Sequence, residues 1–201
     1  MLYEHRGKRP AVDPSAWVAP TAVLCGDVRV GADCAIGFGA VLSAESGSIS
    51  LGRQCVVMEN AVLKASRRAP VAIGNHVLIG PRAYLSGCRI EDDAFLATGV
   101  AIFNDAVIGA RAEIRINGVV HLRTRVPPDA TVPIGWIAVG DPAAILPPGE
   151  HERIWAIQEP LDFPKWVFGL ERPPPGATIM PELTRRYAAL LRGHRDDKEI
   201  G

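Results

Sequence analysis

Residues 90–132 read IEDDAFLATGVAIFNDAVIGARAEIRINGVVHLRTRVPPDATV, and an aliphatic residue stands at every sixth position of this stretch. The same spacing begins at residue 18, with insertions after residues 42 and 63 and one step of five before residue 90. None of these positions is polar. They are Val18, Leu24, Val30, Ile36, Leu42, Leu51, Val57, Leu63, Ile73, Ile79, Leu85, Ile90, Leu96, Ile102, Ile108, Ile114, Val120, Val126 and Val132.

A period of six residues fits neither the 3.6-residue period of an α-helix nor the alternation of a simple strand. It fits a coil with three short flat faces, each supplied by one hexapeptide, whose aliphatic residue fills the interior. A small residue such as Ala40 or Cys55 often stands four positions later, and glycine often follows the aliphatic residue directly. Glycine is expected there to ease a backbone turn that Cβ disfavours. We therefore predict an all-β chain, a left-handed parallel β-helix of about seven coils.

Two insertions interrupt the repeat, residues 43–50 (SAESGSIS) and residues 64–72 (KASRRAPVA). Both are expected to project from the stack as loops, where repeat proteins often carry function.

Composition and charge argue against two classes of function, nucleic-acid binding and membrane association. The 201 residues contain 22 Lys plus Arg and 22 Asp plus Glu, so no net charge draws the chain to nucleic acid or to a membrane surface. Four cysteines lack CxxC spacing and are expected to be buried free thiols. The N-terminal residues resemble no signal peptide, and no apolar run has the length of a membrane span, so a cytoplasmic location is expected.

The hexapeptides end near Pro142, which suggests a β-helix domain with an N-terminal arm over residues 1–146. Residues 147–201 are expected to form helices and an extended segment that pack on the β-helix or on a neighbouring subunit. A helix is predicted through Ile154 and Ile157, an extended apolar segment over 161–168, and a second helix over 181–191. The end of the chain, near Asp197, is expected to fray.

Several motifs resemble the γ-class carbonic anhydrases. They are Trp17-Val18-Ala19-Pro20, Gly26-Asp27-Val28-Arg29-Val30-Gly31, Gly39-Ala40-Val41-Leu42, Asn60-Ala61-Val62-Leu63, Leu85-Ser86-Gly87-Cys88 and Val139-Gly140-Asp141-Pro142-Ala143. This resemblance covers residues 10 to about 146. It implies a homotrimer of left-handed β-helices with sites between subunits.

The resemblance fails at the family's zinc ligands. The three positions that hold histidine in the family are Lys64, Pro81 and Ser86 here. Zinc is held in proteins by imidazole, thiolate or carboxylate donors. Proline offers no side-chain donor, and a protonated lysine repels a cation. No cofactor is therefore expected, and zinc is not expected at this position.

Cationic residues stand at and near the same motif. Lys64, Arg67, Arg68 and Arg82, with the hydroxyl of Ser86, are candidate ligands for a small anion such as a carboxylate or phosphate. The alternative is a solvated loop with intersubunit salt bridges to Glu45, Glu59 or Glu91. His121 and Glu59 are candidate catalytic residues, but the sequence names no partner for either, and His121 equally fits an outward polar stripe.

Three functions stay open at this stage. The first is a metal-free trimeric binding or assembly protein with an anion-binding cleft between subunits. The second is a hexapeptide-repeat acyltransferase that uses an acyl-CoA donor, although neither insertion contains the histidine that such enzymes carry on a loop. The third is a hydrolase or lyase with altered chemistry in the same cleft.

Overall fold

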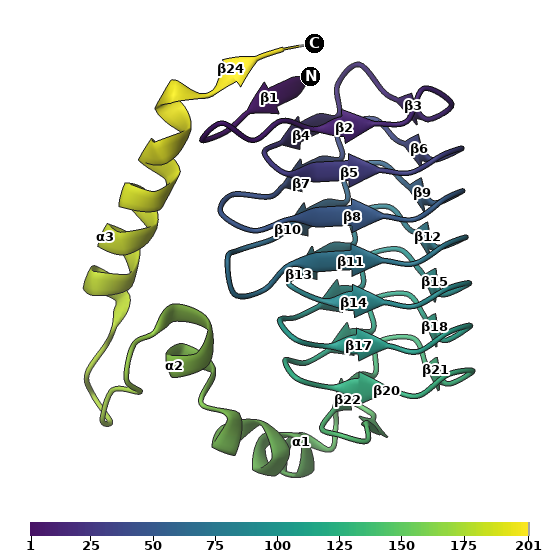
Figure 1. Cartoon of the computed structure of the whole chain (residues 1–201). Coiled ribbons are helices and arrows are strands. Elements are labelled where there is room, and N and C mark those ends of the chain that lie inside the picture. Colours follow the sequence, from purple (N-terminus) through teal and green to yellow (C-terminus); the bar gives the residue numbers. More distant parts are fainter. Residues whose placement is uncertain (201) are drawn as a thin grey trace.

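In the computed structural model, which describes residues 1–200, three parallel sheets wind into a left-handed β-helix, and the C-terminal residues form an arm beside it (Figure 1). The predicted fold class is confirmed. Each strand pairs with the strand one coil away, so the strands along one sheet are every third strand of the chain.

The first face has ten strands. It contains β1 (Leu2–Glu4), β4 (Val23–Cys25), β7 (Val41–Ser43), β10 (Val62–Lys64), β13 (Tyr84–Ser86), β16 (Ala101–Ile102), β19 (Val119–Val120) and β22 (Ile137–Val139), with β23 (Ala144–Leu146) and β24 (Lys198–Glu199) antiparallel at its two ends.

The other two faces have seven strands each. The second contains β2 (Ala11–Val12), β5 (Val28–Val30), β8 (Ile49–Leu51), β11 (Val71–Ile73), β14 (Arg89–Ile90), β17 (Val107–Ile108) and β20 (Arg125–Val126). The third contains β3 (Trp17–Val18), β6 (Ala35–Ile36), β9 (Val56–Val57), β12 (Leu78–Ile79), β15 (Phe95–Leu96), β18 (Glu113–Ile114) and β21 (Thr131–Val132).

The six-residue repeat builds the core. On the first face Leu63 lies in register with Leu42 on one side and Leu85 on the other, and Ile102 follows Leu85. All four side chains are fully buried. A single hexapeptide could not bury its aliphatic residue, so stacking of neighbouring coils creates the hydrophobic interior.

The glycines that follow core aliphatic residues do not have the predicted role of easing a backbone turn. Gly74 and Gly80, which follow core aliphatics, do not have positive φ. A Cβ on Gly80 would lie 2.7 Å from the carbonyl carbon of Ala97 on the next coil, so glycine permits close stacking. The left-handed conformation is instead adopted mostly by polar residues such as Asn60 and Asp93, with φ of 57° and 61°. Short polar side chains tolerate this region best.

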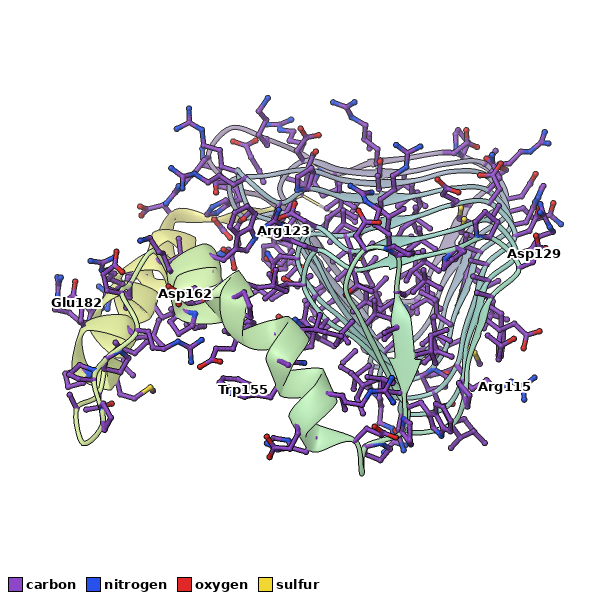
Figure 2. All side chains as sticks on the ribbon, turned by 90° about the horizontal axis from the view of Figure 1, so that it is seen from below. Arg115, Arg123, Asp129, Trp155, Asp162 and Glu182 are labelled. Atoms are coloured by element: carbon purple, nitrogen blue, oxygen red, sulfur yellow. The ribbon has the colours of Figure 1, made fainter. Side chains whose placement is uncertain are left out.

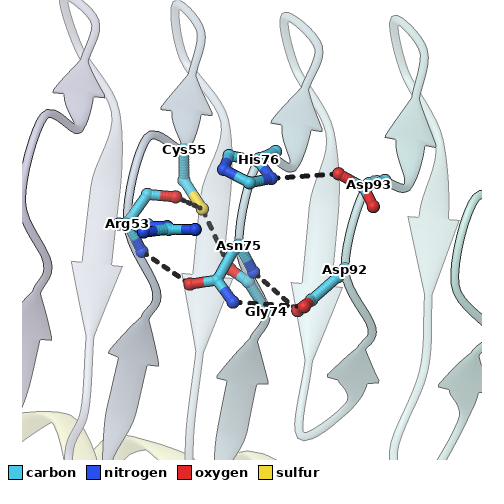
Figure 3. Close-up of polar contacts among 7 residues, drawn as sticks. All are labelled: Arg53, Cys55, Gly74, Asn75, His76, Asp92 and Asp93. Carbon is cyan, nitrogen blue, oxygen red and sulfur yellow. Dashed lines mark hydrogen bonds and ion pairs between the residues drawn. The ribbon is translucent and has the colours of Figure 1, made fainter.

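Stacked polar side chains connect neighbouring corners (Figure 3). The side-chain oxygen of Asn75 accepts from the backbone N–H of Arg53, while its amide nitrogen donates to Asp92 at 3.1 Å. His76 contacts Asp93 at 3.0 Å. His76 is therefore a hydrogen-bonded corner residue, the role that fits a surface histidine in this repeat.

The arm, residues 147–200, runs from the last coil back along the first face to the N-terminal end (Figure 1). It contains α1 (His151–Gln158), the 3₁₀ turn η1 (Glu159–Leu161), α2 (Phe163–Phe168), α3 (Met180–Leu191) and the 3₁₀ turn η2 (Arg192–Asp196). Seen along the β-helix from below, the arm lies to one side of it (Figure 2). No helix among the described residues is long and apolar enough to cross a membrane.

Two predictions for the arm are confirmed and two are wrong. The helices through Ile154 and over 181–191 are present as α1 and α3. The predicted extended segment over 161–168 is helical from Phe163, because Pro164 stands in the first turn, where its missing N–H costs no hydrogen bond. The end of the chain is not frayed, since β24 pairs with β1.

Candidate functional site

A cavity of about 710 Å³ lies between the first face and the arm, and we call it the arm cavity. Strands β7, β10, β13 and β16 with the loops after them form one wall, and α2 and α3 form the other. The apolar lining is Tyr84, Phe103, Phe163, Val167, Phe168, Met180, Leu183, Tyr187 and Leu190. The polar lining is Glu45, Lys64, Ser66, Ser86, Asn104, Thr184 and Arg186. The cavity is thus an apolar chamber with a few polar groups, as is typical of small-molecule sites.

Lys64 stands at the centre of the polar wall. It ends β10, and the register places it between Ser43 and Ser86 on neighbouring coils. Its Nζ lies 3.1 Å from Oε1 of Glu45. Glu45 belongs to the first insertion, and its side chain is only 9% exposed. The sequence offered a salt bridge to Glu45 between subunits as the alternative to a free cationic cluster, whereas the salt bridge in the structure lies within one chain.

The charge state of Lys64 follows from these neighbours. Burial alone lowers its pKa, but the hydrogen bond and negative charge of Glu45, together with Tyr84 and Tyr187, raise it overall. Lys64 is therefore cationic at neutral pH and cannot act as a general base or an amine nucleophile. Burial also raises the pKa of Tyr187, which stays a neutral phenol.

The polar wall continues from Lys64 along the first face. The hydroxyl of Ser86 donates to the Oδ1 of Asn104 at 3.4 Å. Ala65 and Ser66, from the second insertion, border the same end of the cavity. Both insertions therefore contribute to the site, as their projection from the repeat suggested.

The other predicted ligands lie outside the arm cavity. Arg67 and Arg68 are exposed on the second insertion, and the backbone N–H of Arg67 is held by Ser46. Arg82 is exposed at a corner with φ of 58°. Pro81 borders an apolar hollow beside the third face, far around the coil from Lys64. Of the predicted cluster, the structure brings together Lys64 and Ser86.

His121 and Glu59, the candidate catalytic residues, do not line the cavity either. Glu59 is exposed. The His121 ring lies 6.4 Å from that of Phe103 and 6.1 Å from that of Phe163, so it packs behind two lining aromatics. Burial lowers its pKa, and its Nδ1 has no hydrogen-bond partner among the described residues. His121 is therefore a half-buried neutral imidazole adjoining the site.

No sequence motif indicated how the arm is attached to the β-helix. The indole nitrogen of Trp166 donates to Oδ2 of Asp105 at 3.0 Å, and the guanidinium of Arg123 lies 4.8 Å from the centre of the same ring. Both partners belong to the β-helix. Aromatic contacts continue from Phe163 through Phe168 to Tyr187, which orders α2 and α3 over the cavity.

Comparisons with known proteins agree with this architecture. Residues 27–65 and 70–104 match the family described as the hexapeptide repeat of succinyl-transferase. The mitochondrial γ-carbonic anhydrase 2 of Arabidopsis thaliana is 30% identical over 158 residues, which cover 76% of this chain and 55% of that protein. The carnitine operon protein CaiE of Escherichia coli is 35% identical over 107 residues, 53% of this chain and 55% of CaiE. The chain thus spans about half the length of these relatives.

Solved structures give the same result. A provisionally assigned acetyltransferase of Bacillus cereus superposes with a TM-score of 0.63 at 26% identity, covering 79% of this chain and 91% of that one. A hexapeptide transferase family protein of Anaplasma phagocytophilum superposes with a TM-score of 0.52 at 25% identity, covering 78% and 89%. The proteins similar to this chain therefore include γ-carbonic anhydrases and members of the hexapeptide transferase family.

Proposed function

We propose that this chain, a hexapeptide-repeat protein homologous to the γ-class carbonic anhydrases, binds a small organic anion in the arm cavity without a metal at the family's zinc position. One observation carries the proposal. Lys64, which the resemblance matches to a zinc-ligand position of the family, lines an apolar cavity beside Ser86.

The side chains at the three family positions do not suit zinc. Lys64 is a cation held by Glu45, Ser86 is a weak neutral donor, and Pro81 has no donor atom. A hydrated zinc ion needs about three strong protein donors to lower the pKa of its water. We derive no zinc hydroxide step here, and we expect no carbon dioxide hydration.

The cavity favours an anion with an apolar body. An ammonium group has three N–H donors, and Glu45 engages one side of Lys64, so the remaining donors can face a ligand carboxylate. The aromatic and aliphatic walls would take up the rest of the molecule. Each methylene that enters them contributes about 0.8 kcal/mol, or about fourfold in affinity, until the cavity is filled.

The sequence places an anion site between subunits, whereas we propose a site between two parts of one chain. The trimer itself remains part of the proposal, and the third face supports it. Trp17, Val56 and Phe95 are exposed large apolar residues on that face, and Ile116 and Ile134 continue the patch at a corner. Exposed patches of this kind mark protein interfaces. Light scattering should give three times the monomer mass.

An acyltransferase is the second candidate, because solved relatives at 25–26% identity are described as transferases of this type. Against it, no histidine within residues 1–200 lines the arm cavity, so the histidine that such enzymes use as a base is missing there. A hydrolase or lyase would lack the same histidine base in this cavity. A cytoplasmic location also belongs to the proposal, and the four free cysteines fit a reducing compartment.

A thermal-shift panel separates these functions. We expect stabilisation by hexanoate and octanoate that grows with chain length, little from bicarbonate or phosphate, and none from acetyl-CoA. Stabilisation by acetyl-CoA alone would favour the acyltransferase. Carbon dioxide hydration by the zinc-loaded protein would overturn the metal-free site.

A further inference from the structure

Four side chains of metal-binding type meet at the N-terminal end of the β-helix. They are His5, Cys25, His194 and Asp197, and one donor atom from each lies within 4.8 Å of every other. Nδ1 of His5 lies 2.5 Å from Oδ1 of Asp197, and Nδ1 of His194 lies 2.7 Å from Oδ2. The thiol of Cys25 lies 3.4 Å from Oδ2 of Asp197 and 3.9 Å from Nδ1 of His194. We call this group the terminal cluster.

Three segments distant in the sequence build the cluster. His5 follows β1, Cys25 ends β4 on the next coil, and His194 and Asp197 lie in or beside the turn η2 at the end of the arm. Pairing of β24 with β1 brings the two ends of the chain together (Figure 1). No short motif therefore shows the site in the sequence, apart from the three-residue spacing of His194 and Asp197.

The cluster is too well buried for an ordinary surface network. The His5 side chain is 3% exposed and that of Asp197 is 11% exposed. The His194 side chain is 28% exposed and leaves a path from solvent. The two imidazole rings stack with centres 4.4 Å apart, and both aim Nδ1 at the same carboxylate.

A catalytic thiol does not explain this arrangement. A Cys–His–Asp relay needs the thiol at one ring nitrogen and the carboxylate at the other. Here Cys25 and Asp197 both approach Nδ1 of His194.

We infer that the terminal cluster binds a zinc ion, through Nδ1 of His5 and His194, Sγ of Cys25 and a carboxylate oxygen of Asp197. Imidazole nitrogen, thiolate sulfur and carboxylate oxygen are all donor types that zinc accepts, and four donors match its tetrahedral coordination. A thiolate and a carboxylate would balance the two positive charges of the ion, which matters in a buried place.

The spacing of the donors suits a small tetrahedral ion. Zinc–nitrogen distances near 2.1 Å imply roughly 3.4 Å between neighbouring ligand atoms. The distances from Cys25 already lie close to that value, at 3.4 and 3.9 Å. The histidine contact to the ligating oxygen of Asp197 must lengthen by roughly 1 Å or less. Wider separations, which reach at most 4.8 Å, must shorten by up to roughly 1.4 Å, and side-chain rotation can supply both changes.

This site is separate from the arm cavity and would act on the arm. His194 and Asp197 follow α3, which covers the cavity, whereas His5 and Cys25 belong to the β-helix. A zinc ion joining them would fasten the far end of the arm, while Trp166 fastens its middle. Binding to the folded state alone would stabilise the closed arm.

Zinc content of the full, untagged chain tests the inference. Elemental analysis after dialysis against zinc should give about one zinc per chain, falling at least fivefold in C25S and H194A. C88S is a matched control, because Cys88 is an equally buried free thiol that contacts none of the four ligands. H76A controls for loss of a histidine, and both controls should retain the metal.

Cobalt provides a measurement on the wild-type chain if a variant fails to fold. Cobalt bound by this cluster should show thiolate charge-transfer absorption and tetrahedral visible bands, and zinc should displace both. Well under one zinc per chain without these bands would show a hydrogen-bonded network only, and would overturn the inference. Zinc retained by C25S and H194A but lost in K64M would place the metal at the family position and also overturn it.

Discussion

Substitution of Trp166 by alanine should release the arm without unfolding the β-helix. The indole nitrogen donates to Asp105 at 3.0 Å, and Arg123 lies 4.8 Å from the ring centre. Trp166 is half exposed, so we assign about 1 kcal/mol to the hydrogen bond and about 0.5–1 kcal/mol to the cation–π contact. The sum, about 1.5–2 kcal/mol, corresponds to roughly a 10- to 30-fold larger population of the open arm.

Hydrogen exchange read by mass spectrometry measures this population. Peptides from α2 and α3 should exchange about 10- to 30-fold faster in W166A, while those from β10 and β13 should keep wild-type rates. W155A is a matched control, because the Trp155 ring stacks with Arg172 inside the arm. In W155A the rates in α3 should stay near wild type. Unchanged α3 exchange in W166A, or equal acceleration in the β-helix, would refute this account of how the arm is held.

Three further predictions concern the core, the half-buried His121 and the ion pair between Lys64 and Glu45. L85A should lower the free energy of unfolding by about 3–5 kcal/mol in urea titrations, because Leu85 is fully buried between Leu63 and Ile102. As a control, L191A should lower it by under about 0.5 kcal/mol, because Leu191 is exposed. Burial lowers the pKa of His121, so its neutral form stabilises the fold above the unfolded pKa of about 6.5, and that stability is lost as the pH falls below this value. The wild type should therefore lose more stability than H121L between pH 7 and pH 5. Equal losses in the two proteins would contradict the assignment. E45Q should tighten octanoate binding, because it removes a like charge and frees Lys64, whereas weaker binding would mean that Glu45 only positions Lys64.

The repeat was predictable because one geometric constraint recurs in every coil. An aliphatic side chain must point inward once in six residues, so the pattern from Leu24 to Val132 identifies the β-helix without knowledge of any contact. Both insertions stand out as breaks in that pattern. They supply Glu45, Lys64, Ala65 and Ser66, four of the seventeen residues that line the cavity.

The rest depends on contacts between distant residues, which local patterns do not encode. Residues 161–168 are mostly apolar, with only Asp162 and Lys165 charged, so their periodicity could not distinguish a strand from the helix that Phe163 begins. The arm covers Lys64 only because Trp166 docks on the β-helix, and His5 meets Asp197 only because the chain ends pair. The role predicted for the glycines that follow core aliphatic residues was wrong. They permit a close approach of neighbouring coils, which a single sequence does not show.

Titration of octanoate into the untagged protein, with K64M and K165M beside the wild type, tests most directly whether Lys64 anchors a ligand where the family holds zinc. Lys165 is an exposed lysine paired with Glu171 outside the cavity, so K165M controls for loss of one positive charge. A charge-assisted hydrogen bond of about 1.5–3 kcal/mol predicts that K64M binds at least about tenfold more weakly, while K165M binds like the wild type. Equal affinity of K64M and the wild type would contradict the account.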